Sequence, residues 1–442
     1  MRVHAKPALL FLLMGSLSFA LPSTPQQKTP KQPAAKRRTV RVEDPQQALL
    51  AQAEEAIAKK DFPLAVEALQ KYLAEKPEDA LAHVQLGYAF VGLARREEAR
   101  AEFVRAIALD AKLTEAHLNL ALLLMDQEPA AAIAPLSKVI EMKPEQAWPR
   151  QLLGTAYERT GKLPEAIEQY RAAARLDVKN SEVRLDLGRA LLNSNRAGEA
   201  ETSFREALQV EPKSPGARLG LAQSLLVQNK AEAAAPALAA YLELAPEDDA
   251  ARLRLASLLV SLKKYEPALA ELDRVDAARG STPTGLKLRA EILFRQNHLP
   301  EAIAALEKAA QLAPRDAGLR AQLGRLWLEQ RDFPSAEREL LEALRLDAKL
   351  TDAVRDLAAV YYLGEKYEAA LRVQDELARR ETPNAGWWFI RATCYDKLRK
   401  LPEAIAAYEK FLALDEGRSD KQGFQARQRI RILKRELERV RK

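Results

Sequence analysis

Small apolar residues recur along this chain at a fixed interval. Alanine stands at eight positions that are 34 residues apart, from Ala166 to Ala404, and the series continues back to Ala65 with one interval shortened by a residue. A second series of small residues runs in phase with the first: Ala53, Gly87, Ala121, Gly154, Gly188, Ala222, Ala256, Ala290, Gly324, Ala358 and Ala392. Such a period predicts one supersecondary unit per repeat, stacked into an array of about eleven units.

The apolar spacing inside each period predicts two helices. A bulky residue follows the second-series residue by three positions, as at Phe90 and Trp327, which places both residues on one helix face. A turn such as GKLPEA follows, and its proline (Pro164 in this copy) falls where the second helix would begin. A later proline such as Pro212 stops that second helix.

The recurring small residues have a physical reason. Where two helices cross closely, only Gly or Ala lets their backbones approach, and a larger side chain overpacks the contact at a cost of about 1 to 3 kcal/mol.

One repeat interval is a residue short, and the deletion falls in the turn DQEP that precedes Ala132. We therefore predict that the third unit keeps both helices and shortens only its turn.

These features resemble the tetratricopeptide repeat family, over residues 46–418. The resemblance implies an all-α fold, a right-handed superhelical solenoid of antiparallel helix hairpins. Two departures are visible. The tryptophan usual early in the first helix occurs only as Trp388, while His83, His117 and Arg150 replace it elsewhere, and the eighth unit opens irregularly near residues 276–285, a candidate hinge. Residues 419–442 are expected to form a basic helix that caps the array.

The same resemblance implies where partners bind. In the family, the first helices line the concave surface, and the second, fifth, ninth, twelfth and thirteenth positions of a unit face the ligand. Carried onto the second to fourth units, the predicted partner-binding residues are Leu81, Val84, Tyr88, Val91, Leu118, Leu122, Met125, Trp148 and Gln151. This trough is largely apolar and would suit an amphipathic helix or an extended apolar peptide. The alternative is that each residue packs against a neighbouring first helix.

The sequence favours a non-enzymatic protein that needs no cofactor. Glycine-rich phosphate loops, nucleophile elbows and metal-ligand spacings are lacking, and the histidines are too scattered for a predicted metal site. The single cysteine, Cys394, stands where a small buried residue is expected. The chaperone-binding clamp of the family is also unsupported, because Asn119 matches its pattern while Val84 and Tyr88 stand where other polar residues belong.

The amino-terminal segment resembles a secretory signal. Basic Arg2 and Lys6 precede an apolar run that ends in small residues, which predicts cleavage after Ala20 and an exported chain, periplasmic or secreted. The run is short for a bilayer span, which needs about 20 apolar residues, so an uncleaved anchor is only the alternative. Residues 21–45 are rich in Pro, Gln and Lys and are expected to be a disordered linker.

Charge is concentrated at the two ends of the chain. The formal net charge is +7, but residues 1–44 carry +6 (eight basic, two acidic) and residues 418–442 carry +7 (ten basic, three acidic). The repeat body, residues 45–417, is therefore mildly acidic, with a net charge of −6. Binding to phosphate backbones requires a basic face. We therefore predict a protein-protein interaction scaffold of the cell envelope whose basic ends could touch an anionic surface. Two alternatives are a nucleic-acid binder that uses the basic carboxy-terminal tail and an enzyme with a hidden site.

Overall fold

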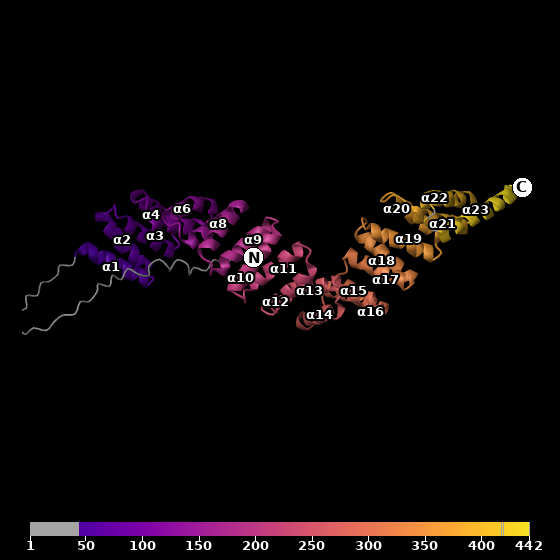
Figure 1. The fold of residues 1–442 in the computed structure, drawn as a ribbon, viewed down its shortest axis with the longest axis horizontal. Helices are drawn as coiled ribbons and strands as arrows, with labels where there is room; N and C mark the ends of the chain where they lie inside the picture. The colour runs from indigo at the N-terminus through magenta and orange to yellow at the C-terminus, as the bar shows by residue number, and fades with distance from the viewer. Residues whose placement is uncertain (1–43, 417, 419, 442) are drawn as a thin grey trace, which may run out of the picture. The chain divides into compact units, whose positions relative to one another are not determined.

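The computed structural model describes residues 44–416, 418 and 420–441 (Figure 1). All regular structure in these residues is helical, with twenty-three helices. The predicted signal, 1–20, and all but the last two residues of the predicted linker, 21–45, lie outside the described residues. The chain divides into two compact units, Met1–Glu78 and Asp79–Lys442. None of the helices in the described part is both long and apolar enough to cross a membrane.

The helices alternate between first and second members of eleven antiparallel hairpins. The first helices are α1 (Pro45–Ala58), α3 (Ala80–Gly92), α5 (Thr114–Leu124), α7 (Ala147–Arg159), α9 (Ser181–Asn193), α11 (Pro215–Val227), α13 (Asp249–Ser261), α15 (Pro283–Arg295), α17 (Ala317–Glu329), α19 (Thr351–Leu363) and α21 (Ala385–Lys397). The second helices are α2 (Phe62–Glu75), α4 (Arg96–Leu109), α6 (Pro129–Met142), α8 (Leu163–Leu176), α10 (Ala197–Val210), α12 (Ala231–Leu242), α14 (Tyr265–Arg279), α16 (Leu299–Leu312), α18 (Phe333–Leu346), α20 (Tyr367–Ala378) and α22 (Leu401–Asp415). The predicted all-α solenoid of helix hairpins is confirmed.

The turn inside a hairpin has one repeated geometry. A single residue adopts a left-handed backbone, as Asn195 does with φ of 58°, and the next N–H donates to the carbonyl five residues back, as from Arg196 to Leu191 at 2.9 Å. This bond satisfies a carbonyl that the end of the first helix leaves free. The left-handed residues are Lys60, Ala94, Gly161, Asn195, Asn229, Lys263, Asn297, Arg331, Glu365 and Arg399.

The third hairpin lacks this left-handed residue. Its absence explains why one repeat interval is a residue short. Helix α5 ends at Leu124 and α6 begins at Pro129, and no residue between them has a positive φ. Instead the N–H of Glu128 donates directly to the carbonyl of Leu124 at 2.8 Å. The predicted deletion in the turn is therefore confirmed, with both helices kept.

Each hairpin is held by a small residue of the first helix that faces a bulky residue of the second. A Cβ atom added at Gly188 would lie 2.6 Å from the ring of Phe204, and one added at Gly154 would lie 2.7 Å from the ring of Tyr170. At these positions the glycine makes room for a side chain. At Gly324 an added Cβ atom would also lie 3.2 Å from the backbone nitrogen of Leu340, which is the close backbone approach that we expected. Where the first helix carries alanine, leucine usually replaces the ring, as in the co-clustered pairs Ala121–Leu136, Ala222–Leu238, Ala256–Leu272 and Ala290–Leu306.

Arginines at the fourth position of several first helices fasten the turn between hairpins. Arg218 donates to the carbonyl of Pro212 at 2.9 Å, and Arg252 donates to that of Pro246 at 2.6 Å. Arg252 also pairs with Glu271 of its own second helix at 2.8 Å. These cations occupy the position of the tryptophan usual in the family, and each donates to a carbonyl of the turn that joins its hairpin to the preceding one.

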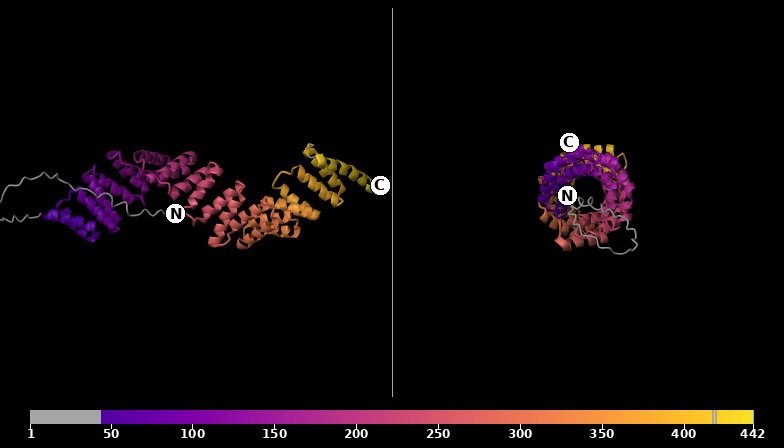
Figure 2. Two further views of the ribbon diagram at one scale, coloured as in Figure 1. Left: turned by 60° about the horizontal axis from the view of Figure 1, so that its bottom comes forward. Right: turned by 90° about the vertical axis from the view of Figure 1, so that its left-hand side faces the viewer.

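Within Asp79–Lys442, the hairpins stack one after another along the chain (Figure 2). The first helices of consecutive hairpins contact each other directly in four places, α3 with α5, α9 with α11, α13 with α15 and α17 with α19. Consecutive second helices in the described part make less contact. Because a stack bends toward the side where neighbours are closer, the first helices form its inner face.

The two remaining predictions concern the eighth unit and the carboxy terminus. Helix α14 extends to Arg279 and is followed by Gly280, with φ of 80°, before α15 begins at Pro283, so the irregularity expected near 276–285 is a longer helix and a glycine turn. Helix α23 (Asp420–Arg441) packs on α22 through Ala426, Ile430 and Leu433, and this confirms the capping helix.

We expect Gly188→Ala to lower the free energy of unfolding by about 1 to 3 kcal/mol, because the new methyl group overlaps the Phe204 ring. Adding Phe204→Leu should recover part of that loss, since the smaller side chain vacates the space. Chemical denaturation followed by circular dichroism measures both effects. Gly198→Ala in α10 is the matched control: its nearest neighbour would be 3.8 Å away, so stability should be unchanged or slightly higher.

Candidate functional site

The nine predicted partner-binding residues lie on α3, α5 and α7 or at the end of α5, but not all of them are accessible. Leu81 is 58% exposed, and five others are partly buried: Tyr88, Val91, Leu122, Trp148 and Gln151. These six can contribute to a surface on the first helices. Their role in binding stays a prediction.

Val84, Leu118 and Met125 are buried in the packed helices. Leu118 is only 1% exposed, and Met125 belongs to the cluster that joins Leu136 and Leu153. Their apolar character is therefore accounted for by packing between hairpins, and a ligand could not reach them without separating the helices. For these three residues the alternative interpretation applies, in which the side chain packs against neighbouring helices and does not line a binding surface.

Helix α7 carries a polar network on the face that includes Trp148 and Gln151. Gln151 Nε2 donates to Asp186 Oδ2 of α9 at 2.8 Å. Thr155 Oγ1 lies 3.1 Å from the hydroxyl of Tyr170, and that hydroxyl donates to Glu158 Oε2 at 3.0 Å. Burial raises the pKa of Tyr170 well above its usual range, so the hydroxyl stays protonated and keeps donating.

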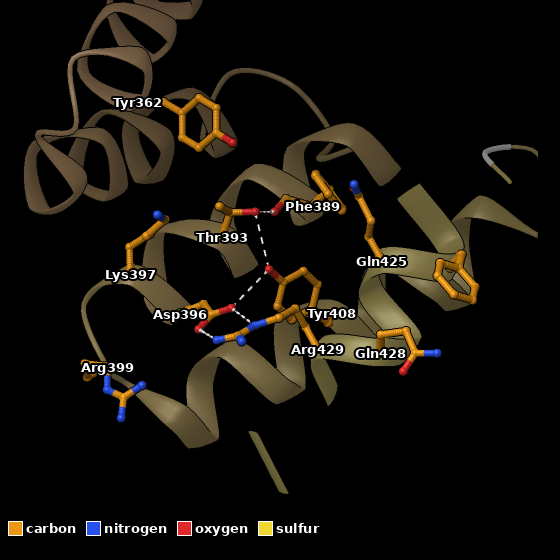
Figure 3. A pocket seen from close by; sticks show the side chains of 11 residues that line it. Tyr362, Phe389, Thr393, Asp396, Lys397, Arg399, Tyr408, Gln425, Gln428 and Arg429 are labelled. Atoms are coloured by element: carbon orange, nitrogen blue, oxygen red, sulfur yellow. Dashed lines mark hydrogen bonds and ion pairs between the residues drawn. The ribbon is translucent and has the colours of Figure 1, made fainter. Parts of the chain in front are cut away.

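The last hairpin and α23 line an open pocket of about 730 Å³ that sequence reasoning missed (Figure 3). Tyr362 of α19 faces it from one side, while α21, α22 and α23 supply the other walls. A pocket of this size falls in the range of small-molecule and peptide-side-chain sites. Its lining residues are Tyr362, Phe389, Thr393, Asp396, Lys397, Arg399, Tyr408, Phe424, Gln425, Gln428 and Arg429.

An ion pair between Asp396 and Arg429 forms the centre of the pocket wall (Figure 3). The guanidinium donates from Nε to Asp396 Oδ2 at 2.7 Å and from Nη2 to Oδ1 at 2.6 Å, a two-bond contact that raises the pKa of Arg429. Tyr408 adds a longer hydrogen bond to Asp396 Oδ2 at 3.5 Å, and Thr393 Oγ1 lies 3.5 Å from the Tyr408 hydroxyl. The pair therefore docks α23 onto α21.

Most charged groups that line the pocket are already paired within the chain. Asp396 is committed to Arg429, and Arg399 pairs with Glu436 at 3.1 Å. The exposed ammonium group of Lys397 remains for a ligand, together with the amides of Gln425 and Gln428. One feature of the sequence could have pointed to this pocket, because Thr393 and Asp396 have the same spacing as Thr155 and Glu158 of α7. The position of α23 next to these residues could not be predicted from the sequence.

The residues considered for catalysis have packing roles. Cys394 is fully buried, and burial raises the pKa of its thiol to about 12, so it is inert at neutral pH. His83 Nδ1 lies 2.6 Å from Glu102 Oε2, and His117 Nε2 lies 3.1 Å from the Ala111 carbonyl. The described part of the chain contains no group of three or more His, Cys, Asp or Glu residues arranged to hold a metal ion.

Helix α23 turns a basic stripe away from the hairpins. Four arginines follow one another at intervals of four residues, and none of them forms an ion pair with another described residue: Arg427, Arg431, Arg435 and Arg439. Exposed Phe424 lies on the same helix. Such a stripe solvates the end of an array, and it is the part of the described chain that comes nearest to the basic face a nucleic-acid binder needs.

Comparison with protein families identifies the repeat. A family model described as a tetratricopeptide repeat matches residues 152–218 and 355–419, and one described as a tetratricopeptide repeat-like domain matches residues 190–326. Two curated proteins are 32% identical to this chain over 80 residues: the Hsp70-Hsp90 organizing protein of Triticum aestivum and the Hsp70-Hsp90 organizing protein 1 of Glycine max. The match spans 18% of this chain and 14% of either relative.

Several solved structures are also similar to parts of the chain. MamA protein is 24% identical, with a TM-score of 0.37, and the match covers 38% of this chain and 93% of MamA. YrrB, a TPR protein with an unusual peptide-binding site, is 21% identical with a TM-score of 0.39, covering 45% and 100%. PilF of Pseudomonas aeruginosa is 19% identical with a TM-score of 0.38, covering 49% and 99%.

We expect Arg429→Gln to loosen α23 from the array, because it leaves the mostly buried Asp396 carboxylate without its cation. The cost should be about 2 kcal/mol, below that of a fully buried pair, since the Arg429 side chain is 38% exposed. Amide hydrogen exchange over residues 420–441 reads out this loosening. Adding Asp396→Asn should restore much of the protection, and equal exchange in Arg429→Gln and wild type would show that the pair does not dock the helix.

Proposed function

The chain belongs to the tetratricopeptide repeat family, and we propose that it is a non-enzymatic scaffold that binds a peptide or protein segment along its first helices. Members of this family generally act as scaffolds for other proteins. A stack of hairpins cannot cover the inner face of its first helices with its own side chains. This face is therefore the surface on which a partner gains most contact.

The observation that carries the proposal is the exposure of apolar residues at the positions that the family uses for ligands. Leu81 is the second residue of its unit, Phe294 the twelfth, and Val227 and Leu363 the thirteenth, and all four are exposed. Each apolar Å² that a partner covers contributes about 25 cal/mol. Exposed apolar side chains at these positions support binding of an extended or helical segment with apolar side chains.

Two narrower functions receive less support from this chain. The carboxylate clamp of chaperone-binding relatives would need free polar groups on three consecutive units, but Asn119 donates its amide to the Glu115 carbonyl of its own helix at 2.9 Å. Nucleic-acid binding would need cations on the inner face, and the exposed residues there are apolar or of mixed charge. Protein partners fit this surface better than either.

We also propose that the chain acts outside the cytoplasm, in the periplasm or cell envelope. The support is the order of basic, apolar and small residues over 1–20, followed by the polar segment 21–45. After cleavage, a segment of that composition would be a polar extension at the amino terminus of the array.

The binding surface can be tested by site-specific photo-crosslinking of the full chain in cells. With a photoreactive residue at Leu81, Val227, Phe294 or Leu363, we expect adducts with the same partner from at least two neighbouring positions, because these side chains lie along the first helices. Val104 and Leu341, exposed on second helices, are the matched controls and should give no such adduct. Adducts to that partner only from the control positions would place binding on the outer face.

The location is tested by amino-terminal sequencing of the purified chain and by cell fractionation. Cleavage of the signal should give a mature chain that begins at Leu21 and is recovered outside the cytoplasm. A variant without residues 2–20 is the cytosolic reference. A chain that begins at Met1 and fractionates with that reference would refute export.

A further inference from the structure

The same three side chains occur together twice in the array. A threonine, an acidic residue three positions later on the first helix, and a tyrosine on the second helix are separated by seven repeat periods: Thr155, Glu158 and Tyr170 in the fourth hairpin, and Thr393, Asp396 and Tyr408 in the eleventh. In both copies the tyrosine hydroxyl lies between the threonine and the carboxylate. This arrangement holds a carboxylate in place at the twelfth position of a unit, where the family meets its ligands.

The chain itself shows what the eleventh copy holds. Asp396 accepts two hydrogen bonds from the guanidinium of Arg429, at 2.6 and 2.7 Å, and Figure 3 shows that side chain reaching across from α23. Planar, two-bond contact of this kind is specific to arginine. The site in the last hairpin is therefore an arginine site that the capping helix occupies.

The fourth copy has the tighter geometry and no cation on its carboxylate. The hydrogen bonds of Tyr170 are 3.0 and 3.1 Å long, against 3.5 Å for both contacts of Tyr408. Glu158 has no ion-pair partner among residues 44–416, 418 and 420–441. One carboxylate edge of Glu158 is thus free to accept a donor from outside the chain.

Neighbouring charges increase the preference of this place for a cation. The carboxylate of Asp186 lies close enough to Tyr170 to raise the pKa of that hydroxyl, after the larger effect of burial. Asp186 is itself paired with Arg189 of the same helix. Glu158 has no such partner among the described residues, so its negative charge is not compensated by an ion pair at this partly buried surface.

We propose that Glu158 receives an arginine side chain of the bound partner segment, as Asp396 receives Arg429. This rests on the proposed function and adds to it the chemistry of the partner. Trp148, Gln151 and Thr155 lie on the same face of α7 at helical spacing, and Leu122 and Leu185 are partly exposed on the adjoining first helices. The partner segment is thus an arginine flanked by apolar residues.

The experiment uses the full chain and peptides selected on it from a random dodecapeptide display library. Each selected peptide is made with arginine and with citrulline, which has the same shape and no charge, and its affinity is measured by fluorescence anisotropy. We expect Glu158→Gln to weaken the arginine peptide about tenfold and to leave the citrulline peptide unchanged, because the lost interaction is the charged pair. Glu168→Gln, on the exposed face of α8 in the same hairpin, is the matched control and should alter neither.

The outcomes separate this inference from the function on which it rests. Peptides that bind with equal affinity to wild type and Glu158→Gln, and show no preference for arginine over citrulline, would refute the arginine site and leave the scaffold function standing. If instead Arg189 turns to serve Glu158, Glu158→Gln will lower the thermal midpoint without changing peptide affinity, which also refutes it. Failure of the full chain to bind any peptide would count against the scaffold function itself.

Discussion

The structure depends on one contact, repeated in each hairpin, between a small residue of the first helix and a bulky residue of the second. At Gly188 and Phe204 the ring occupies the space in which a Cβ atom would lie. This contact sets the distance and crossing of the two helices, and it makes each hairpin a nearly identical building block. Identical blocks with one apolar side left over must stack, because no single hairpin can bury that side alone.

Stacking of such blocks separates two kinds of residue. Side chains between hairpins, such as Leu118 and Met125, become core, whereas side chains on the inner face of the first helices, such as Leu81 and Val227, remain open. Both kinds are apolar, so apolarity alone does not distinguish a binding residue from a packing residue. Exposed apolar side chains occur on second helices as well, as at Val104 and Leu341, so exposure must be combined with the position in the repeat.

The last hairpin shows how another element can cover the exposed side of a hairpin. Helix α23 covers the last hairpin with Ile430 and Leu433 and adds the Asp396–Arg429 pair to the contact. Under our proposal, a partner that binds an uncovered hairpin makes the same two kinds of contact, apolar burial and one ion pair. The uncovered equivalent, Glu158 with Tyr170, is built from residues of the same kind at the same repeat positions.

The sequence by itself determined the period, the helix pairs and the turn that loses a residue, because these follow from local spacing and from small residues at fixed intervals. It could also point to the family positions that face a ligand. Only the tertiary structure decided that Val84, Leu118 and Met125 are buried while Leu81 is exposed, since burial depends on how neighbouring hairpins rotate against each other. The pairing of Arg429 with Asp396 was likewise beyond the sequence, because α23 lies outside the repeat and its docking is fixed by contacts with α22 that have no periodic signal.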